Sequence, residues 1–182
     1  MLHTISIKYT EYDIHCKGVP ELHYAHELII ALKKFAMKDS YDKFDIMDRS
    51  GPINPYSYHA INSRHAKIPD SEVIQIIPLL KRCFPKITFR ISGQFIYGPG
   101  DKIDEHTNAN DPTDVLYITY ATGKSKFSYR YDINDDFIDT YDIINGITLR
   151  AFTVTSNQPY TFHKVECESG YRVSLGLRYV AI

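Results

Sequence analysis

From residue 86 to the end of the chain, apolar and polar residues alternate in short segments separated by turn-forming residues. In the first segment Ile87, Phe89 and Ile91 occupy every second position, which places their side chains on one face of an extended strand. The pattern covers residues 87–91, 94–97, 102–106, 114–121, 126–131, 146–154, 160–165 and 171–181. Seven or eight strands with such short connections predict an antiparallel sandwich or barrel, because parallel βαβ units need long crossover connections.

The first 85 residues show a different pattern. Residues 4–9 alternate as in a strand. Apolar residues at helical spacing between positions 22 and 36 predict a helix, and Pro20 suits its first turn. Residues 41–47 predict a short strand, and residues 73–85 predict a second helix that is interrupted by an internal proline.

Residues 49–70 are rich in glycine, proline, asparagine and serine, which predicts a long loop. A loop of about twenty residues is unusual in a compact domain and is often functional. Its aromatic and basic residues are of the kinds that stack on and neutralise single-stranded nucleic acid: Tyr56, Tyr58, His59, Arg64, His65 and Lys67. An ordinary surface loop that packs its tyrosines explains the same composition.

The chain has 182 residues, enough for one domain with its own core. We predict a single domain, 1–182, in which residues 1–85 form an N-terminal helical and lid extension and residues 86–182 form the β core. The net charge of −1 provides no general basic field for nucleic acid, so any such contact needs a local patch. Three widely spaced cysteines and the lack of a long apolar N-terminal run predict reduced thiols in an intracellular, cytoplasmic protein without a signal peptide or membrane span.

Possible metal ligands follow a Pro-Gly turn in the middle of the chain. His106 and Asn108 are two residues apart, so an extended strand would point both side chains to one face. His163 could supply a further ligand. Two histidines and one oxygen ligand, with open positions left over, is the arrangement of non-haem Fe(II) oxygenases.

The last strand segment carries two arginines on one face. Arg172 and Arg178 are six residues apart, and Ser174 and Gly176 lie between them on the same face. Such a face leaves room for a small dianion, because a guanidinium binds a carboxylate through two parallel hydrogen bonds.

Together these segments resemble a known family. The stretch Tyr97-x-Pro99-Gly100-x-Lys102-x-x-x-His106-x-Asn108, followed by His163 and the Arg172-to-Arg178 strand, is similar to the motifs of AlkB-like 2-oxoglutarate/Fe(II) dioxygenases. The resemblance covers roughly residues 86–182. It implies a mainly β fold with flanking helices (α+β): a double-stranded β-helix, or jelly roll, with the N-terminal helices packed on one sheet.

The resemblance also implies cofactors and roles. The residues expected to bind Fe(II), and so to be catalytic, are His106, Asn108 and His163. The residues expected to bind 2-oxoglutarate are Tyr97, Arg172, Ser174 and Arg178, with Arg172 at the far carboxylate and Arg178 near the metal-chelating end. The implied reaction couples loss of CO2 from 2-oxoglutarate to hydroxylation of a C–H bond, and on an N-methyl group it releases formaldehyde. The expected partner is a modified nucleic-acid base, with a protein or small molecule as the alternative, and the expected assembly is a monomer with no membrane partner.

Three positions depart from the family pattern. Asn108 stands where the family has its metal carboxylate, Asn110 replaces a second acidic residue, and Phe95 replaces an asparagine before the tyrosine. A neutral amide lacks the charge that holds a hard dication, so metal affinity should be weakened. Asp111 could reach the metal only if the chain bulges after Asn108. Two other interpretations therefore stay open: a catalytically degenerate jelly roll that binds a ligand or partner, and a cupin-like or lectin-like jelly roll with unrelated histidines.

Overall fold

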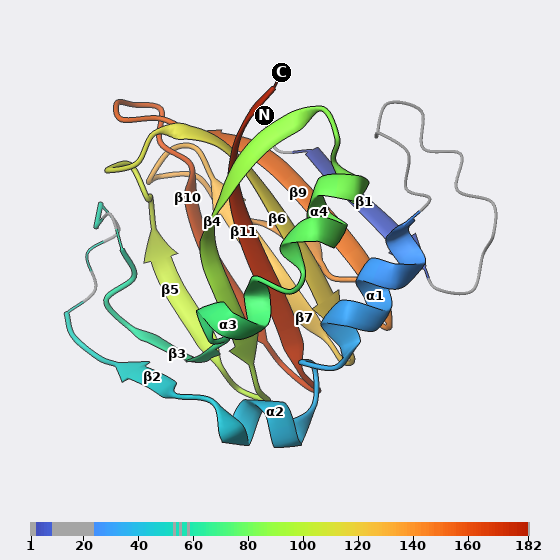
Figure 1. Cartoon of the computed structure of the whole chain (residues 1–182). Helices are drawn as coiled ribbons and strands as arrows, with labels where there is room; N and C mark the ends of the chain where they lie inside the picture. The colour runs from blue at the N-terminus through green and yellow to red at the C-terminus, as the bar shows by residue number, and fades with distance from the viewer. Residues whose placement is uncertain (1–2, 9–23, 53, 55, 58, 182) are drawn as a thin grey trace.

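A computed structural model describes residues 3–8, 24–52, 54, 56–57 and 59–181 (Figure 1). Its elements in chain order are β1 (His3–Lys8), α1 (Ala25–Lys33), α2 (Lys38–Lys43), β2 (Ile46–Arg49), β3 (Ser63–Lys67), α3 (Asp70–Val73), α4 (Ile77–Cys83), β4 (Ile87–Tyr97), β5 (Lys102–His106), β6 (Thr113–Ala121), β7 (Ser125–Arg130), β8 (Ile138–Tyr141), β9 (Gly146–Val154), β10 (Phe162–Cys167) and β11 (Arg172–Ala181).

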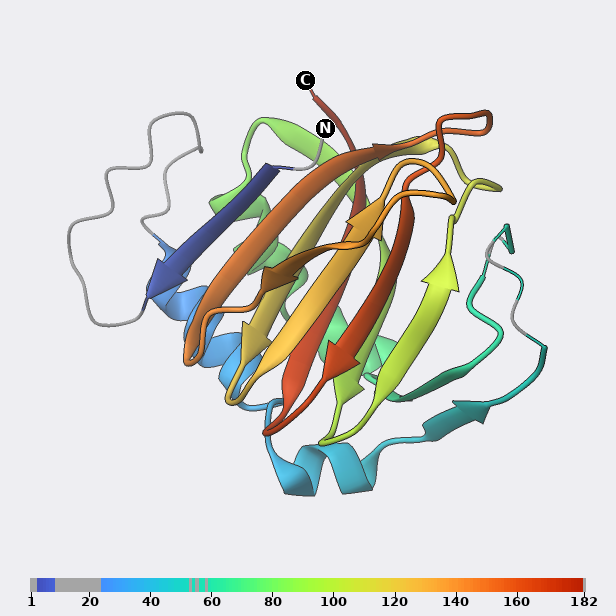
Figure 2. The same ribbon diagram turned by 180° about the vertical axis from the view of Figure 1, so that it is seen from behind.

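The strands form a curled antiparallel sheet in the order β1-β9-β6-β11-β4-β3-β5-β10-β7-β8, and β2 pairs with β3. Strands β5, β10, β7 and β8 fold over the larger half of the sheet, as the view from behind shows (Figure 2). Strand β3 joins the two halves: it pairs with β4 at Ala66↔Ile96 and with β5 at Ser63↔Ile103. The predicted mainly β fold with flanking helices is confirmed.

The two faces of the larger half bury different surfaces. Helices α1 and α4 cover its outer face (Figure 1), where Leu32 packs in the same core as Leu175 and Ile118. The inner face looks toward the smaller half, and Phe127 and Phe152 belong to the core between them. Alternation along β11 therefore sends its leucines toward the helices and its arginines into the curled sheet.

Several local predictions for the first 85 residues are wrong. Residues 41–47 do not form one strand, because α2 ends at Lys43 and β2 begins at Ile46. The Tyr41 hydroxyl donates a hydrogen bond of 2.6 Å to the Asp101 carboxylate, so a distant contact holds this helical turn in place. The predicted loop 49–70 contains strand β3. Strands β1, β2 and β3 all come from this part of the chain and join the sheet, and the proposed first turn of the helix near Pro20 lies outside the described residues. In the later part of the chain, β8 was not predicted.

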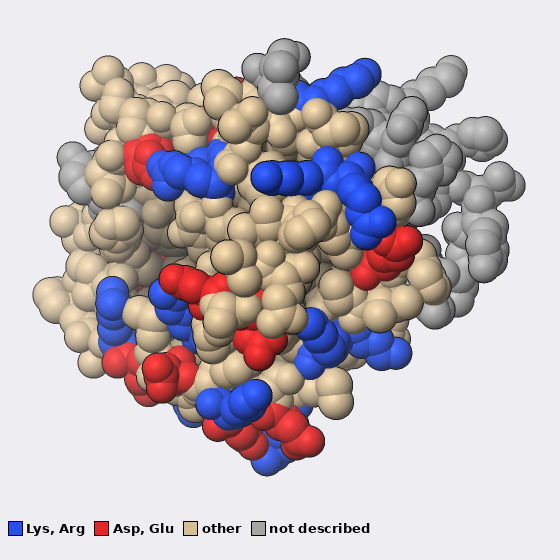
Figure 3. Space-filling view, in the orientation of Figure 1, with Lys and Arg blue, Asp and Glu red and all other residues tan. Residues whose placement is uncertain are grey.

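Three further observations concern the surface charge, the thiols and the helices. On the face shown in Figure 3, basic and acidic side chains are interspersed, so no extended basic surface covers it. Cys83 and Cys167 are free and buried, while Cys16 lies outside the described residues. Within the described ranges, no helix is both long and apolar enough to cross a lipid bilayer.

Candidate metal and cosubstrate site

The two predicted histidines meet inside the curled sheet. Strands β5 and β10 are antiparallel neighbours, and their register places His106 directly opposite His163. The ring centroids are 4.2 Å apart. Each Nδ1 lies within hydrogen-bond distance of the carbonyl oxygen two residues earlier, at 2.9 Å from Asp104 and 3.0 Å from Thr161. Because a carbonyl oxygen only accepts, each Nδ1 carries the proton, and both Nε2 atoms keep a lone pair for a metal.

Burial sets the charge of this pair. Burial lowers the pKa of His106 to about 4, and the backbone hydrogen bond to Asp104 offsets only part of that effect. Burial also lowers the pKa of His163 well below its ordinary value, and the neighbouring His106 lowers it further. Both rings are therefore neutral at physiological pH, which is the form of imidazole that binds metal.

Asn108 reaches the same place by a route that strand periodicity did not predict. Strand β5 ends at His106, and Asn108 has a left-handed backbone with φ of 56°. Asparagine is one of the few residue types other than glycine that occupies this region readily. Its Nδ2 lies 3.1 Å from His163 Nε2 and 3.4 Å from the Tyr117 hydroxyl oxygen. The turn after the strand, and not the strand itself, brings the amide to the histidine.

The nearby carboxylates are paired with arginines. Asp111 forms ion pairs with Arg178, at 3.2 Å, and with Arg90. Glu105 accepts two hydrogen bonds from Arg130, at 2.7 and 2.9 Å. In the part of the chain that the structure describes, no three side chains of histidine, cysteine, aspartate or glutamate are placed to hold one metal ion. The donor set is therefore two imidazoles and one amide.

A cavity of about 460 Å³ lies over the two histidines. Three of the predicted cosubstrate residues, Tyr97, Ser174 and Arg178, line its wall. Arg178 also donates a hydrogen bond to the backbone carbonyl oxygen of Asp111, and this bond stabilises the turn that carries Asn108. A cavity of this volume is in the range that holds a small organic ligand.

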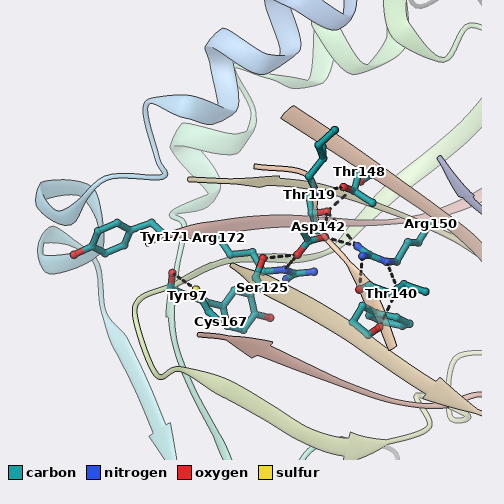
Figure 4. A network of polar contacts seen from close by, with 12 residues as sticks. Tyr97, Thr119, Ser125, Thr140, Asp142, Thr148, Arg150, Cys167, Tyr171 and Arg172 are labelled. Carbon is teal, nitrogen blue, oxygen red and sulfur yellow. Dashed lines mark hydrogen bonds and ion pairs between the residues drawn. The ribbon is translucent and has the colours of Figure 1, made fainter. Parts of the chain in front are cut away.

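Arg172 lies deeper than the other predicted residues. Its side chain is fully buried, and its guanidinium carbon lies 5.1 Å from the centre of the Tyr97 ring (Figure 4). Its Nε donates a hydrogen bond of 2.7 Å to the Asp142 carboxylate. Its Nη1 and Nη2 are buried and have no hydrogen-bond partner within the described ranges. Tyr97 lines the cavity and contacts Arg172, whereas Arg172 itself is not among the residues that line the cavity.

Asp142 is shared by two buried arginines, and this network was not predicted from the sequence (Figure 4). Its other oxygen accepts from Arg150 Nη1 at 2.5 Å, and Ser125 adds a hydrogen bond of 2.6 Å. Burial works to raise the pKa of the Asp142 carboxyl, but the charges of Arg172 and Arg150 outweigh it and hold that pKa below its usual range. Two cations and one anion leave a net charge of about +1 inside the sheet.

The side chains fit a metal and a diacid in most respects. The two Nε2 atoms, each with a lone pair, suit a divalent first-row metal. The unpartnered Nη atoms of Arg172 suit a carboxylate, which would also balance the excess buried charge. The exception is Asn108, whose amide oxygen is a weaker ligand than a carboxylate and whose amide nitrogen lies 3.1 Å from His163 Nε2.

Comparison with known proteins supports the fold. No family model matches the sequence, and no curated protein matches it. The structure of a Pseudomonas putida prolyl-4-hydroxylase is similar over 100% of this chain and 92% of that one, with a TM-score of 0.51 and 9% sequence identity. An oxidoreductase of the 2OG-Fe(II) oxygenase family from Burkholderia pseudomallei matches 74% of this chain and 64% of its own, with a TM-score of 0.41 and 15% identity. The first of these similarities shows that the chain has the fold of the prolyl-4-hydroxylase structure.

Proposed function

We propose that this protein is a 2-oxoglutarate- and Fe(II)-dependent dioxygenase. The observation that carries the proposal is the facing pair of His106 and His163, each with Nδ1 fixed by a backbone carbonyl and Nε2 directed away from it. Side chains held in this way are ordered before a metal binds, so little conformational freedom is lost on binding. The Asn108 amide oxygen is the third protein ligand in this proposal, after rotation of the amide.

The chain's own residues also bind and orient the cosubstrate. Arg172 would hold the far carboxylate of 2-oxoglutarate through its two unpartnered nitrogens, and Tyr97 would flank the same molecule from the cavity wall. The bound Fe(II) and 2-oxoglutarate would supply O2 activation and the oxidising equivalent for hydroxylating a C–H bond. The buried aromatic rings around His163 exclude water from the reacting atoms.

The substrate is a separate part of the proposal. A modified nucleic-acid base remains a prediction that depends on the sequence resemblance. The alternative is a protein side chain or a small molecule, either of which a cavity of about 460 Å³ can hold.

One observation favours a second function, a jelly roll that binds a ligand without catalysis. The Asn108 amide nitrogen lies 3.1 Å from His163 Nε2, so a hydrogen bond satisfies the ring where a metal would otherwise bind. An amide in this place competes with the metal for the ring, whereas a carboxylate would attract the metal.

The two functions differ in how ligands stabilise the protein. A ligand that binds only the folded state adds about 2.7 kcal/mol at a concentration one hundred times its dissociation constant. We expect Mn(II) and 2-oxoglutarate together to raise the melting temperature more than the sum of their separate effects. Asn108→Asp should increase the Mn(II) affinity, measured by calorimetry, because it restores a charged ligand.

Matched variants separate the parts of the site. Arg172→Met should abolish the effect of 2-oxoglutarate and keep that of Mn(II), while His163→Ala should abolish both. If millimolar Mn(II) leaves the melting temperature of the Asn108→Asp variant unchanged, the two histidines do not form a metal site and the ligand-binding function is preferred.

A further inference from the structure

Another histidine on the cavity wall, His65, has no hydrogen-bond partner among the residues that the structure describes. We propose that His65 is the residue that recognises the substrate, and that it binds an uncharged polar group of that substrate. The inference rests on the proposed function only in taking the cavity over His106 and His163 as the place where the substrate reacts.

His65 is placed by strand pairing. It lies in β3, the strand that joins the two halves of the sheet, and its register partner on β2 is Met47. Its ring packs edge-on against Phe95, with centroids 4.4 Å apart, and lies 5.8 Å from the ring of Tyr97. The residue is only 4% exposed, and it lines the same cavity as the two candidate metal ligands. Its ring is therefore fixed in direction and faces the cavity.

Both ring nitrogens of His65 are buried, and no atom of the described part of the chain forms a hydrogen bond with either. This differs from His106 and His163, where a backbone carbonyl holds one nitrogen of each ring. Leaving a buried donor or acceptor unpaired is unfavourable, and such groups in a folded protein call for an explanation. A polar group of a ligand in the cavity would pair with these nitrogens and remove that penalty.

The neighbouring charges indicate the kind of group. The charged side chains that line the cavity are Arg49, Arg90, Arg178 and Asp111, so arginines outnumber carboxylates. A cationic group is disfavoured in such a cavity. Burial and the nearby Arg49 lower the pKa of His65 to about 4, so its ring offers one neutral donor and one acceptor at physiological pH. A carboxylate only accepts hydrogen bonds and would leave the acceptor nitrogen of His65 unpaired, whereas an amide or a hydroxyl both donates and accepts and matches the ring.

A metal-binding role for His65 does not fit. The described residues contain no set of three histidine, cysteine or acidic side chains arranged around one ion, so His65 does not complete a three-histidine site with His106 and His163. Its contacts with Phe95 and Tyr97 place it on the wall of the cavity, beside the reacting centre.

The first test needs no ligand. His65→Phe removes both unpaired nitrogens and keeps a ring against Phe95, so the melting temperature of the metal-free protein should rise by a few degrees. The matched control His163→Phe should lower it, because the Thr161 carbonyl then loses its partner. A fall in the His65 variant as large as in the control would show that His65 has a structural role and would overturn the proposal.

The second test uses the wild-type protein and two small probes of similar size. With ¹⁵N-labelled histidine, N-methylacetamide at high millimolar concentration should shift the His65 nitrogen resonances, and acetate should not. The His65→Phe variant should lose binding of N-methylacetamide. A shift with acetate alone, or no shift with either probe because bound water keeps both nitrogens, would contradict the proposal. Neither measurement uses a metal or 2-oxoglutarate, so a negative result here is distinct from failure of the proposed function.

Discussion

The buried charges around Asp142 predict how strongly substitutions of this residue and of its two arginine partners destabilise the protein. Asp142 binds both Arg150 and Arg172, and all three side chains are almost completely inaccessible. Asp142→Asn removes the only anion of the three and leaves two buried cations. Removing one partner of a buried ion pair typically costs about 3–5 kcal/mol, and here two cations lose their counterion. For a chain of 182 residues this corresponds to a fall in melting temperature of about 6–20 °C.

Loss of either arginine has a smaller effect, because a balanced pair remains. Arg172→Met leaves Asp142 with Arg150 and also removes the two unpartnered Nη atoms, so stability should change by no more than about 1 kcal/mol. Arg150→Met leaves Asp142 with Arg172 but also unpairs Thr140, which accepts hydrogen bonds of 2.9 Å from Arg150 at both its hydroxyl and its carbonyl. That variant should be destabilised by about 1–3 kcal/mol.

Urea unfolding followed by circular dichroism at pH 7, without metal or 2-oxoglutarate, measures all three variants. The exposed Lys38–Asp42 pair is the control, since Asp42→Asn should change stability by less than about 1 kcal/mol. The expected order of destabilisation is Asp142→Asn, then Arg150→Met, then Arg172→Met. If Arg172→Met is as destabilising as Asp142→Asn, Arg172 is not a surplus cation and the charge argument is wrong.

Two further predictions concern the pH dependence of stability and the close packing of Gly123 against Ser169. The folded protein lowers the pKa of His106 to about 4, against 6.5 for a free ring. Between these two pH values the unfolded chain therefore binds more protons at this residue than the folded chain does. The contribution of neutral His106 to the free energy of unfolding is complete above pH 6.5 and falls by about 1.4 kcal/mol per pH unit below that value. Urea unfolding at pH 7 and pH 5 measures this difference. Equal stability at the two pH values would contradict the burial of a neutral ring. Gly123→Ala should cost about 1–3 kcal/mol in the same assay, because an added Cβ would lie 2.2 Å from the Ser169 carbonyl oxygen. The neighbouring exposed variant Lys124→Ala should be near neutral, and similar values for the two would refute the steric argument.

The sequence predicts the β core well because the alternation of apolar residues is local information. It also indicated His106 and His163, since residue type and order along the chain are enough to suggest a shared ion. The approach of Asn108 was predicted for the wrong reason: the side chain arrives through a left-handed turn and not through strand periodicity. Turn conformation at a single residue depends on contacts that periodicity does not reveal.

The residues that were not predicted share one property. Arg150 lies in a strand of mainly apolar residues, and its charge is explained only by Asp142, which comes from the segment before that strand. The sequence places His65 among the aromatic and basic residues of a predicted loop, because β3 is short and its partners β4 and β5 lie later in the chain. Cross-strand pairing therefore carries the information that local patterns lack. An isolated arginine at an inward position of a strand would have been the available signal for Arg150.

The hydrogen bonds from His106 and His163 to backbone carbonyls have a consequence for how this protein can change in evolution. Because backbone atoms orient both rings, loss or gain of tight ion binding does not require a new scaffold. Asparagine and aspartate have nearly the same shape, and their codons differ by one nucleotide. Under the proposed function, one point mutation at position 108 therefore separates a weak metal site from a stronger one, and the chain could change between a ligand-binding module and an enzyme without losing its fold.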